Sequence, residues 1–289
     1  QGVAQEVARI HDPHSRRVSH AGRPFVAGAY PRTSVAAMPA SLSFAEYGVG
    51  IGDASSVVRA NAVSAGLSAP VPSCPGWTVL DLVLHVGLAD RWAVANLEGV
   101  PQDQWPSEDA ARAEGLAAPD VLDWFDEGMA QLLHTLASAP EDLQVFFFLK
   151  DAPRPREAWA RRQCHETTIH GVDTMAARLG RLPTAAETWI RPALAADGID
   201  ELLMGFVPRK SGRLRTTAEQ QPYAVRVQAT DIDRAWTLRM STDPVVATTG
   251  TRAQELARAD GEGHGIPDVV LEGSATELYL GLWNRGALT

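Results

Sequence analysis

The sequence predicts a helix bundle followed by a small α+β domain, and three observations support this expectation. The first part of the chain holds four amphipathic stretches with apolar residues at helical spacing and no strand pattern between them, which is typical of a bundle. After about residue 200 the pattern changes to the alternation of half-buried strands. Near the end, Ser274 followed by Glu277 predicts a capped helix. We therefore expect a four-helix bundle over residues 41–195 and an α+β domain over 196–289.

The stretch before the bundle, residues 1–40, shows no sustained hydrophobic period. Pro, Gly, Ser, His and Arg are scattered through it. Such a segment lacks the apolar surface needed for a packed structure, so we expect a disordered tail. Met38 is a candidate translation start, since residue 1 is Gln.

The first two bundle helices are expected over residues 43–67 and about 79–98. Glycines within the first disfavour a helix. The second has a clear start, because Thr78 can cap it and Asp81 follows three residues later, close to the capping-box pattern.

The other two bundle helices are bounded by proline and glycine. One is expected to start near Pro119, at a first-turn position that suits proline, and to end before Pro140. The fourth is expected over about 156–179, with Gly180 directly after its end.

The last third of the chain predicts strands and one more helix. Residues 222–231 and 233–242 alternate apolar and polar side chains, which predicts a hairpin. A short strand should end near Glu272, and the helix that Ser274 caps should run through Trp283.

Composition and charge narrow the class of protein. The 289 residues are 45% hydrophobic and 21% charged, with a net charge of −9, as expected for a globular protein without a nucleic-acid partner. No apolar stretch is long enough to cross a bilayer, so we expect no membrane partner. Two cysteines are too few for a disulfide scaffold and fit a reducing cytoplasm. We expect a monomer or a small homo-oligomer.

A histidine motif lies in residues 161–173, RRQCHETTIHGVD. The zinc-protease pattern H-E-x-x-H spaces its histidines four apart, whereas His165 and His170 are five apart and point roughly 140° away from each other on a helix. Glu166 and His170 are four apart and share one helix face. If this helix binds a metal, Glu166 and His170 are therefore the ligands and His165 is not.

The third ligand should come from a facing helix. His85 is the best candidate, because it is surrounded at helical spacing by apolar residues of the second helix, and bundle cores commonly hold metal sites. Asp173 lies about one turn after His170 and could orient its imidazole.

Simpler interpretations of these residues remain open. His85 could be a core histidine, and Glu166 with His170 could be a surface pair at i,i+4 spacing. We expect His134, Cys164 and His165 to be ordinary helix residues, and nothing in the sequence activates Cys74 as a nucleophile.

Two stretches, VPSCPGWTVLDLVLHVG and WARRQCHETTIHGVD, resemble the mycothiol-dependent maleylpyruvate isomerase family. The ending EGSATELYLGLWNRG is similar to the end of the same family's second domain. The resemblance covers roughly residues 42–289 and implies a DinB-like metal-binding bundle followed by a sterol-carrier-like domain. It also implies zinc bound by His85, Glu166 and His170. Family members often have an arginine and an aromatic residue where this sequence has Gly171 and Val172.

The resemblance implies a cytoplasmic zinc enzyme that uses mycothiol against a small electrophile, as an isomerase or as an S-transferase. Zinc ionises a bound thiol, and a thiolate is a strong nucleophile. Arg226 and Arg239 on the hairpin are candidate catalytic residues that would hold a substrate carboxylate. The alternatives are a non-catalytic small-molecule or lipid-binding protein and a thiol-independent zinc hydrolase.

Overall fold

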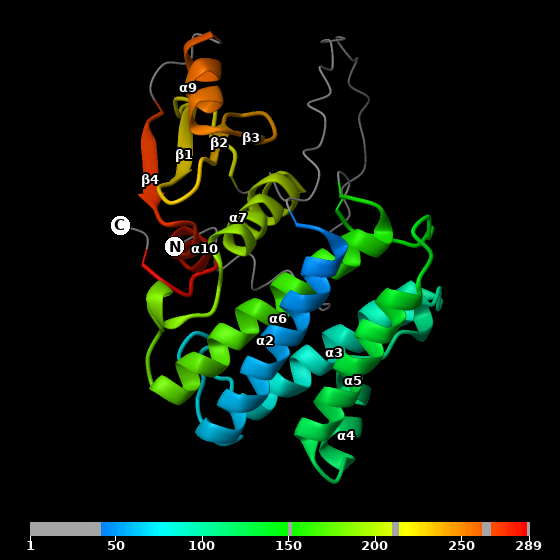
Figure 1. The fold of residues 1–289 in the computed structure, drawn as a ribbon. Helices are drawn as coiled ribbons and strands as arrows, with labels where there is room; N and C mark the ends of the chain where they lie inside the picture. Colours follow the sequence, from blue (N-terminus) through cyan, green and yellow to red (C-terminus); the bar gives the residue numbers. More distant parts are fainter. Residues whose placement is uncertain (1–41, 150–151, 210–213, 262–266, 288–289) are drawn as a thin grey trace.

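The computed structural model describes residues 42–149, 152–209, 214–261 and 267–287. The tail expected over residues 1–40 lies outside these residues. Figure 1 shows a helical part and, at one end of it, a small sheet. The predicted fold class, a helix bundle followed by a small α+β domain, is confirmed.

Four long helices form the bundle, and their bounds agree closely with the sequence pattern. They are α2 (Phe44–Ala65), α3 (Val79–Leu97), α5 (Val121–Ser138) and α6 (Pro155–Leu179). Helix α2 packs along α6, and α3 packs along α5 (Figure 1). Ile51, Leu82 and Phe125 are fully buried between these helices. This core fixes the relative positions of α3 and α6, which carry the histidines of interest.

The ends of these helices test the capping predictions. The expected box is present at α3, where Thr78 Oγ1 accepts from the Asp81 backbone and Asp81 Oδ2 accepts from the Thr78 backbone. Gly180 after α6 has a φ of 68°, in the left-handed region that favours glycine. Helix α5 starts near Pro119 as expected, but the proline is not in its first turn. Asp120 caps that helix, with Oδ1 accepting from Leu122 N at 2.8 Å, so Pro119 lies before the helix and not in its first turn.

Several helices were not expected from the sequence. Helix α4 (Glu108–Ala117) buries only Ala111 and Gly115, so it has little apolar periodicity. Helix α7 (Pro192–Asp200) continues through a π-helical segment, Glu201–Phe206, into α8 (Val207–Arg209). There are also two short 3₁₀ turns, η2 (Gln102–Gln104) and η3 (Ala185–Glu187). The boundary expected between residues 195 and 196 falls inside α7.

The sheet has four strands in the order β3-β2-β1-β4. The predicted hairpin is confirmed, since β1 (Tyr223–Ala229) pairs antiparallel with β2 (Ala235–Met240). Strand β3 (Val246–Gly250) and helix α9 (Arg252–Gly261) were not expected. Strand β4 (Val269–Gly273) runs parallel to β1, and the capped helix α10 (Ala275–Leu282) follows it.

The two faces of the sheet contact different helices. On one face, Trp236 of β2 is fully buried and its Nε1 donates to Asp200 of α7 at 3.2 Å. On the other face, Thr248 of β3 donates to Glu255 of α9 at 2.7 Å. Helices α7 and α10 therefore lie between the sheet and the bundle (Figure 1), while α9 covers the far face.

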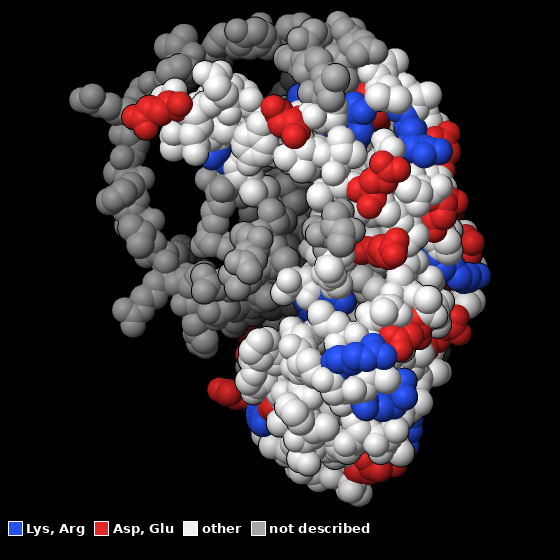
Figure 2. Space-filling view, turned by 90° about the vertical axis from the view of Figure 1, so that its left-hand side faces the viewer, with Lys and Arg blue, Asp and Glu red and all other residues white. Residues whose placement is uncertain are grey.

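Charged side chains of both signs are scattered over the face drawn in Figure 2. On the face drawn in Figure 2, the described acidic and basic residues are interspersed and form no continuous basic patch. Among the described residues, none of the helices is both long and apolar enough to cross a membrane.

Candidate metal centre

Three side chains from two helices converge on one point in the bundle. Glu166 Oε1 lies 3.3 Å from His85 Nε2 and 3.2 Å from His170 Nε2. The three potential ligand atoms all lie within 4.8 Å of one another. Helix α3 supplies His85, and one face of α6 supplies Glu166 and His170. The structure therefore brings together the trio that helix geometry and family resemblance selected.

The side chains of His85, Glu166 and His170 are mostly, but not completely, buried. Exposed side-chain fractions are 18% for His85, 9% for Glu166 and 11% for His170. The imidazoles of His85 and His170 meet edge to face with centroids 5.0 Å apart, and Trp77 makes a similar contact with His85. The rings are thus held in place by packing, while each of the three side chains keeps a small exposed fraction.

His170 is oriented from behind by a chain of hydrogen bonds. Its Nδ1 lies 2.9 Å from Asp173 Oδ2, while Arg285 donates to both carboxylate oxygens of Asp173 at 2.9 Å. Ser73 also donates to Asp173. An ionised carboxylate only accepts, so His170 Nδ1 carries the proton and Nε2 is left to face the trio.

Glu166 is held on its second oxygen by Arg162. Arg162 Nη2 donates to Glu166 Oε2 at 3.1 Å, and its Nη1 donates to Glu201. All three residues are buried. Oε2 therefore faces a guanidinium while Oε1 faces the two imidazoles.

The electrostatics of the cluster favour a cation at the trio. Burial lowers the pKa of His170, but hydrogen bonds to Asp173 and Glu166 outweigh it and raise that pKa to about 9. Burial likewise opposes ionisation of Asp173, yet Arg285 keeps its pKa well below the ordinary value. The carboxylates thus attract positive charge to the point where the three donor atoms meet. Two imidazole nitrogens and one carboxylate oxygen are a donor set that suits a catalytic zinc ion.

His165 points away from the trio, as the five-residue spacing predicts. Its Nε2 lies 2.8 Å from Asp197 Oδ1 and its Nδ1 lies 3.2 Å from Tyr279 Oη. It is fully buried where α6 meets α7 and α10. The expectation that it is an ordinary helix residue was therefore wrong, because it joins a buried polar network between the bundle and the C-terminal helices.

Cys74 lies close to the candidate metal centre, but its thiol is not activated. Its Sγ is 3.5 Å from Asp173 Oδ2 and 3.5 Å from Arg285 Nη2. Burial, with the nearby Asp173 carboxylate, raises the pKa of Cys74 to about 12. Cys74 therefore remains a thiol at neutral pH and is a poor nucleophile.

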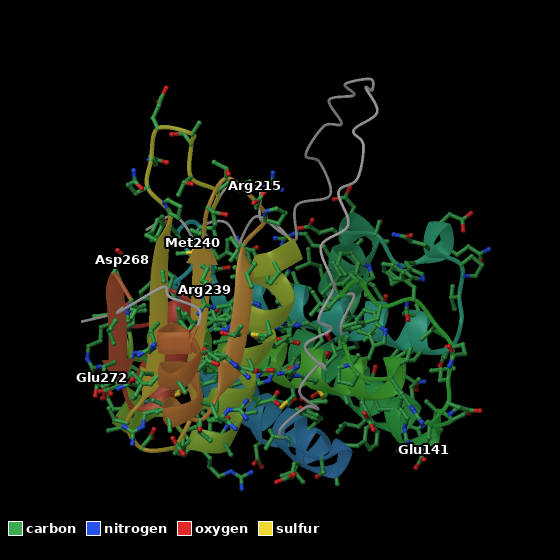
Figure 3. All side chains as sticks on the ribbon, turned by 90° about the horizontal axis from the view of Figure 1, so that it is seen from above. Glu141, Arg215, Arg239, Met240, Asp268 and Glu272 are labelled. Carbon is green, nitrogen blue, oxygen red and sulfur yellow. The ribbon has the colours of Figure 1, made fainter. Side chains whose placement is uncertain are left out.

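The structure does not bring Arg226 and Arg239 to the trio. Arg226 is buried and its Nη2 donates to the Glu255 carbonyl of α9. Arg239 is on the same sheet face, since residues of one strand alternate and Arg239 pairs with Ala224, two residues before Arg226. Figure 3 labels Arg239 and the next residue, Met240, which is buried and lies on the opposite face because side chains alternate along a strand. Both arginines thus lie across the sheet from the bundle, so we do not assign them a catalytic role.

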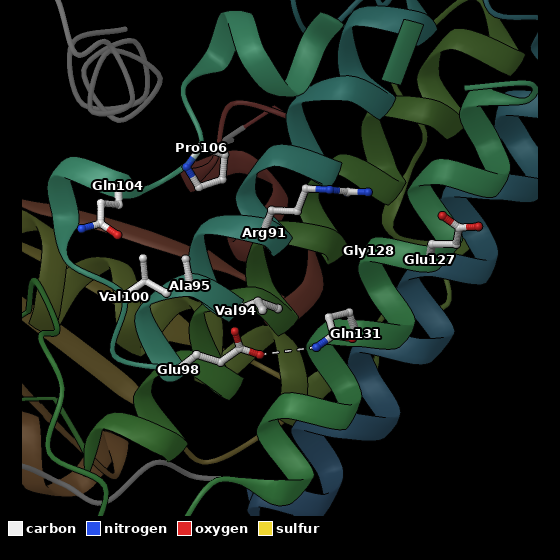
Figure 4. A pocket seen from close by; sticks show the side chains of 10 residues that line it. All are labelled: Arg91, Val94, Ala95, Glu98, Val100, Gln104, Pro106, Glu127, Gly128 and Gln131. Atoms are coloured by element: carbon white, nitrogen blue, oxygen red, sulfur yellow. Dashed lines mark hydrogen bonds between the residues drawn. The ribbon is translucent and has the colours of Figure 1, made fainter. Parts of the chain in front are cut away.

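Two pockets lie on the helical part. A pocket of about 240 Å³ opens beside His85 and is lined by Gly76, Trp77, Asp81, Leu84, His85, Leu88, Glu108 and Arg112. Another, of about 330 Å³, lies between α3 and α5 and does not include the trio (Figure 4). In that second pocket Gln131 donates to Glu98 at 3.4 Å. Of these two pockets, the one beside His85 is lined by a residue of the candidate metal centre.

Three charged residues that support the trio were not identified from the sequence. Arg162 carried a local signal, because it precedes Glu166 by four residues and can therefore reach it along the helix. Arg285 lies in the C-terminal motif but has no local feature that connects it to Asp173. Glu201 likewise meets Arg162 only through the packing of α6 against the segment after α7.

Comparison with known families and structures identifies similar proteins. The model described as the mycothiol maleylpyruvate isomerase N-terminal domain matches residues 51–174, and the corresponding C-terminal domain model matches residues 193–289. A sequence comparison with curated proteins gives no match.

Two crystal structures share the fold. One is a mycothiol-dependent maleylpyruvate isomerase, with a TM-score of 0.52 and 14% sequence identity, and it covers 85% of this chain and 91% of that chain. The other is a histidine-to-alanine mutant of such an isomerase, with a TM-score of 0.53, 13% identity and the same coverage of both chains. At these identities the likeness concerns the fold alone.

Proposed function

Because this chain belongs to the mycothiol-dependent maleylpyruvate isomerase family, we propose that it is an enzyme in which zinc activates mycothiol towards a small electrophile. His85, Glu166 and His170 would hold the metal. The reaction would be cis–trans isomerisation of a maleylpyruvate-type substrate when the thiol is released again. It would be S-transfer when the new carbon–sulfur bond is kept.

The convergence of the trio carries this proposal. Two imidazole nitrogens from different helices lie within 3.3 Å of one carboxylate oxygen. Three protein ligands and one open position are typical of catalytic zinc sites, whereas structural sites use four protein ligands. When bound, zinc would supply a positive charge that ionises a coordinated thiol at neutral pH.

The chain's own residues would orient these ligands. Asp173 accepts a hydrogen bond from His170 Nδ1, so Nε2 would be the nitrogen available to the metal. Arg285 keeps Asp173 ionised and fixed. The pocket beside His85 would admit the thiol and the electrophile, and its walls would limit the access of water.

A cytoplasmic location fits this chemistry. Cys74 and Cys164 are both free in the structure, as expected of thiols in a reducing compartment. A small-molecule thiol cofactor also needs such an environment to stay reduced.

Metal analysis combined with a thiol-dependent assay tests the proposal. His85→Ala and His170→Ala should each lose the metal, whereas the control His134→Ala should keep it, because His134 is exposed on α5. Turnover of maleylpyruvate should require both the metal and added mycothiol. Unchanged metal content in both trio variants would contradict the metal site. Full turnover without thiol would favour a zinc hydrolase, and binding without turnover would favour a non-catalytic binding protein.

A further inference from the structure

One oxygen of the Glu166 carboxylate contacts the two histidines, and the other accepts a hydrogen bond from Arg162. We propose that Arg162 holds this second oxygen away from the metal, so that one metal coordination position stays open for the thiol. Arg162 would restrict Glu166 to a single ligand oxygen. The inference rests on the proposed metal site, but it concerns a residue outside the trio.

The distances assign each carboxylate oxygen to one side. Oε1 lies 3.2 Å from His170 Nε2 and 3.3 Å from His85 Nε2. Oε2 instead accepts from Arg162 Nη2 at 3.1 Å. A carboxylate held in this way offers one oxygen to the trio and keeps the other in a charge-assisted hydrogen bond.

Arg162 is itself held firmly. Only 4% of it is exposed, and Glu201, which is 2% exposed, accepts from its Nη1. The rings of Phe206 and Trp283 lie 5.4 Å and 5.5 Å from the guanidinium carbon. Glu201 is the first residue of the π-helical segment Glu201–Phe206, and such segments are frequent at functional sites. Arg162 therefore cannot swing away from Glu166 without breaking a second buried ion pair.

The consequence concerns the number of ligands. A carboxylate can bind a metal through one oxygen or through both, and zinc takes four or five ligands. If Oε2 were released, it could take the position that the thiol needs. Arg162 would then be a positioning residue that acts through Glu166 and preserves the open position.

The neighbouring residue provides a matched control. Arg161 is also buried, at 8% exposure, and it also binds carboxylates that follow α6 in the chain. It donates to Asp197 Oδ1 at 2.7 Å and to Asp200 Oδ2 at 3.3 Å. Arg161→Gln and Arg162→Gln therefore each remove a buried ion pair from the same helix, but only Arg162 contacts Glu166.

Cobalt substitution allows the coordination itself to be measured. The wild type, Arg161→Gln and Arg162→Gln are loaded with Co²⁺ and titrated with mycothiol, while the thiolate-to-cobalt absorption band is recorded. We expect stoichiometric cobalt in all three. The dissociation constant for the thiol should rise at least about tenfold in Arg162→Gln only, the size expected for loss of a residue that orients a ligand. Arg162→Lys keeps the positive charge but cannot donate to two carboxylates as a guanidinium does. Its dissociation constant for the thiol should therefore lie between those of the wild type and Arg162→Gln.

A second variant separates the effect from instability. In Arg162→Gln/Glu201→Gln no buried charge is left unpaired behind the site, and the thiol affinity should still be low. A thiol titration of Arg162→Gln equal to the wild type would overturn the inference. Equal weakening in Arg161→Gln, or loss of cobalt from Arg162→Gln, would also overturn it. If the wild type binds no cobalt, the proposed metal site itself fails, which is a different result.

Discussion

Arg285 binds Asp173 through two parallel hydrogen bonds of 2.9 Å, from Nε to Oδ1 and from Nη2 to Oδ2. Asp173 in turn contacts Nδ1 of His170. A residue that follows the last helix therefore fixes a histidine of the bundle, although the two are separated by most of the C-terminal half. The candidate metal centre therefore depends on residues of the bundle and on a residue near the end of the chain.

Arg285→Lys should weaken metal binding, because a lysine cannot donate two parallel hydrogen bonds to one carboxylate. We expect a loss of roughly 10–100-fold in metal affinity, measured by competition with a chelator. Arg181→Lys is the control, since Arg181 makes a similar two-bond pair with Glu187 on the exposed surface. Equal affinities of the Arg285 variant and the wild type would show that the pair does not orient His170.

Asp90→Asn should change how stability depends on pH. Asp90 is fully buried, and burial raises its pKa from 3.8 to about 8. Between these values the folded state keeps a proton that the unfolded state releases, so stability falls as pH rises. The asparagine variant should lose this slope, which is at most about 1.4 kcal/mol per pH unit.

Urea denaturation at pH 5 and pH 8 would measure the difference. The difference in unfolding free energy between Asp90→Asn and the wild type should favour the variant more at pH 8 than at pH 5, because only the wild type loses stability as the pH rises. Asparagine can keep the 3.1 Å hydrogen bond that Gln163 donates to Asp90 Oδ1. Asp103→Asn, at an exposed position, should show no such trend. A gain independent of pH would argue against a protonated Asp90 in the folded state.

His165→Ala should reduce stability and leave metal binding intact. The fully buried imidazole contacts both Asp197 and Tyr279, so its removal leaves a cavity and weakens a buried network. We expect a loss of about 2–4 kcal/mol in urea denaturation. Metal content per folded molecule should match the wild type. A variant that lost its metal while remaining folded would contradict the orientation of His165 away from the trio.

Gly198→Ala should destabilise the contact between α7 and α10. A Cβ at this position would clash with the Tyr279 ring and lie 2.9 Å from His165 Nδ1. Both neighbours are fully buried and cannot move freely, so we expect a cost of about 1–3 kcal/mol.

Gly48→Ala, also a glycine-to-alanine change, should instead increase stability. Gly48 lies within α2, and a Cβ there would meet nothing within 4 Å. Alanine should therefore stabilise the helix by roughly 0.5–1 kcal/mol. Thermal or urea unfolding of both variants measures whether the unfolding free energy falls for Gly198→Ala and rises for Gly48→Ala. A Gly198→Ala variant as stable as the wild type would show that α7 and α10 pack less closely than the structure indicates.

The sequence by itself determined the features that depend on residues within one or two helical turns. Helix periodicity separated Glu166 and His170 from His165, because the azimuth of a side chain follows from its spacing alone. The Thr78 cap was recognisable for the same reason, since its hydrogen bonds span three residues. Helix α4 and strand β3 were missed because their buried residues are small or polar, so the sequence shows no clear apolar pattern there.

Only the tertiary structure decided which distant groups support the trio. Strand alternation places Arg226 and Arg239 on one face of the hairpin, but the packing of α9 and α7 determines that this face points away from the bundle. Arg285 reaches the site instead, because the end of α10 packs beside α6 and the buried Asp173 needs a cation to remain ionised. Pairings of this kind depend on how the whole chain closes on itself, so no local pattern in the sequence records them.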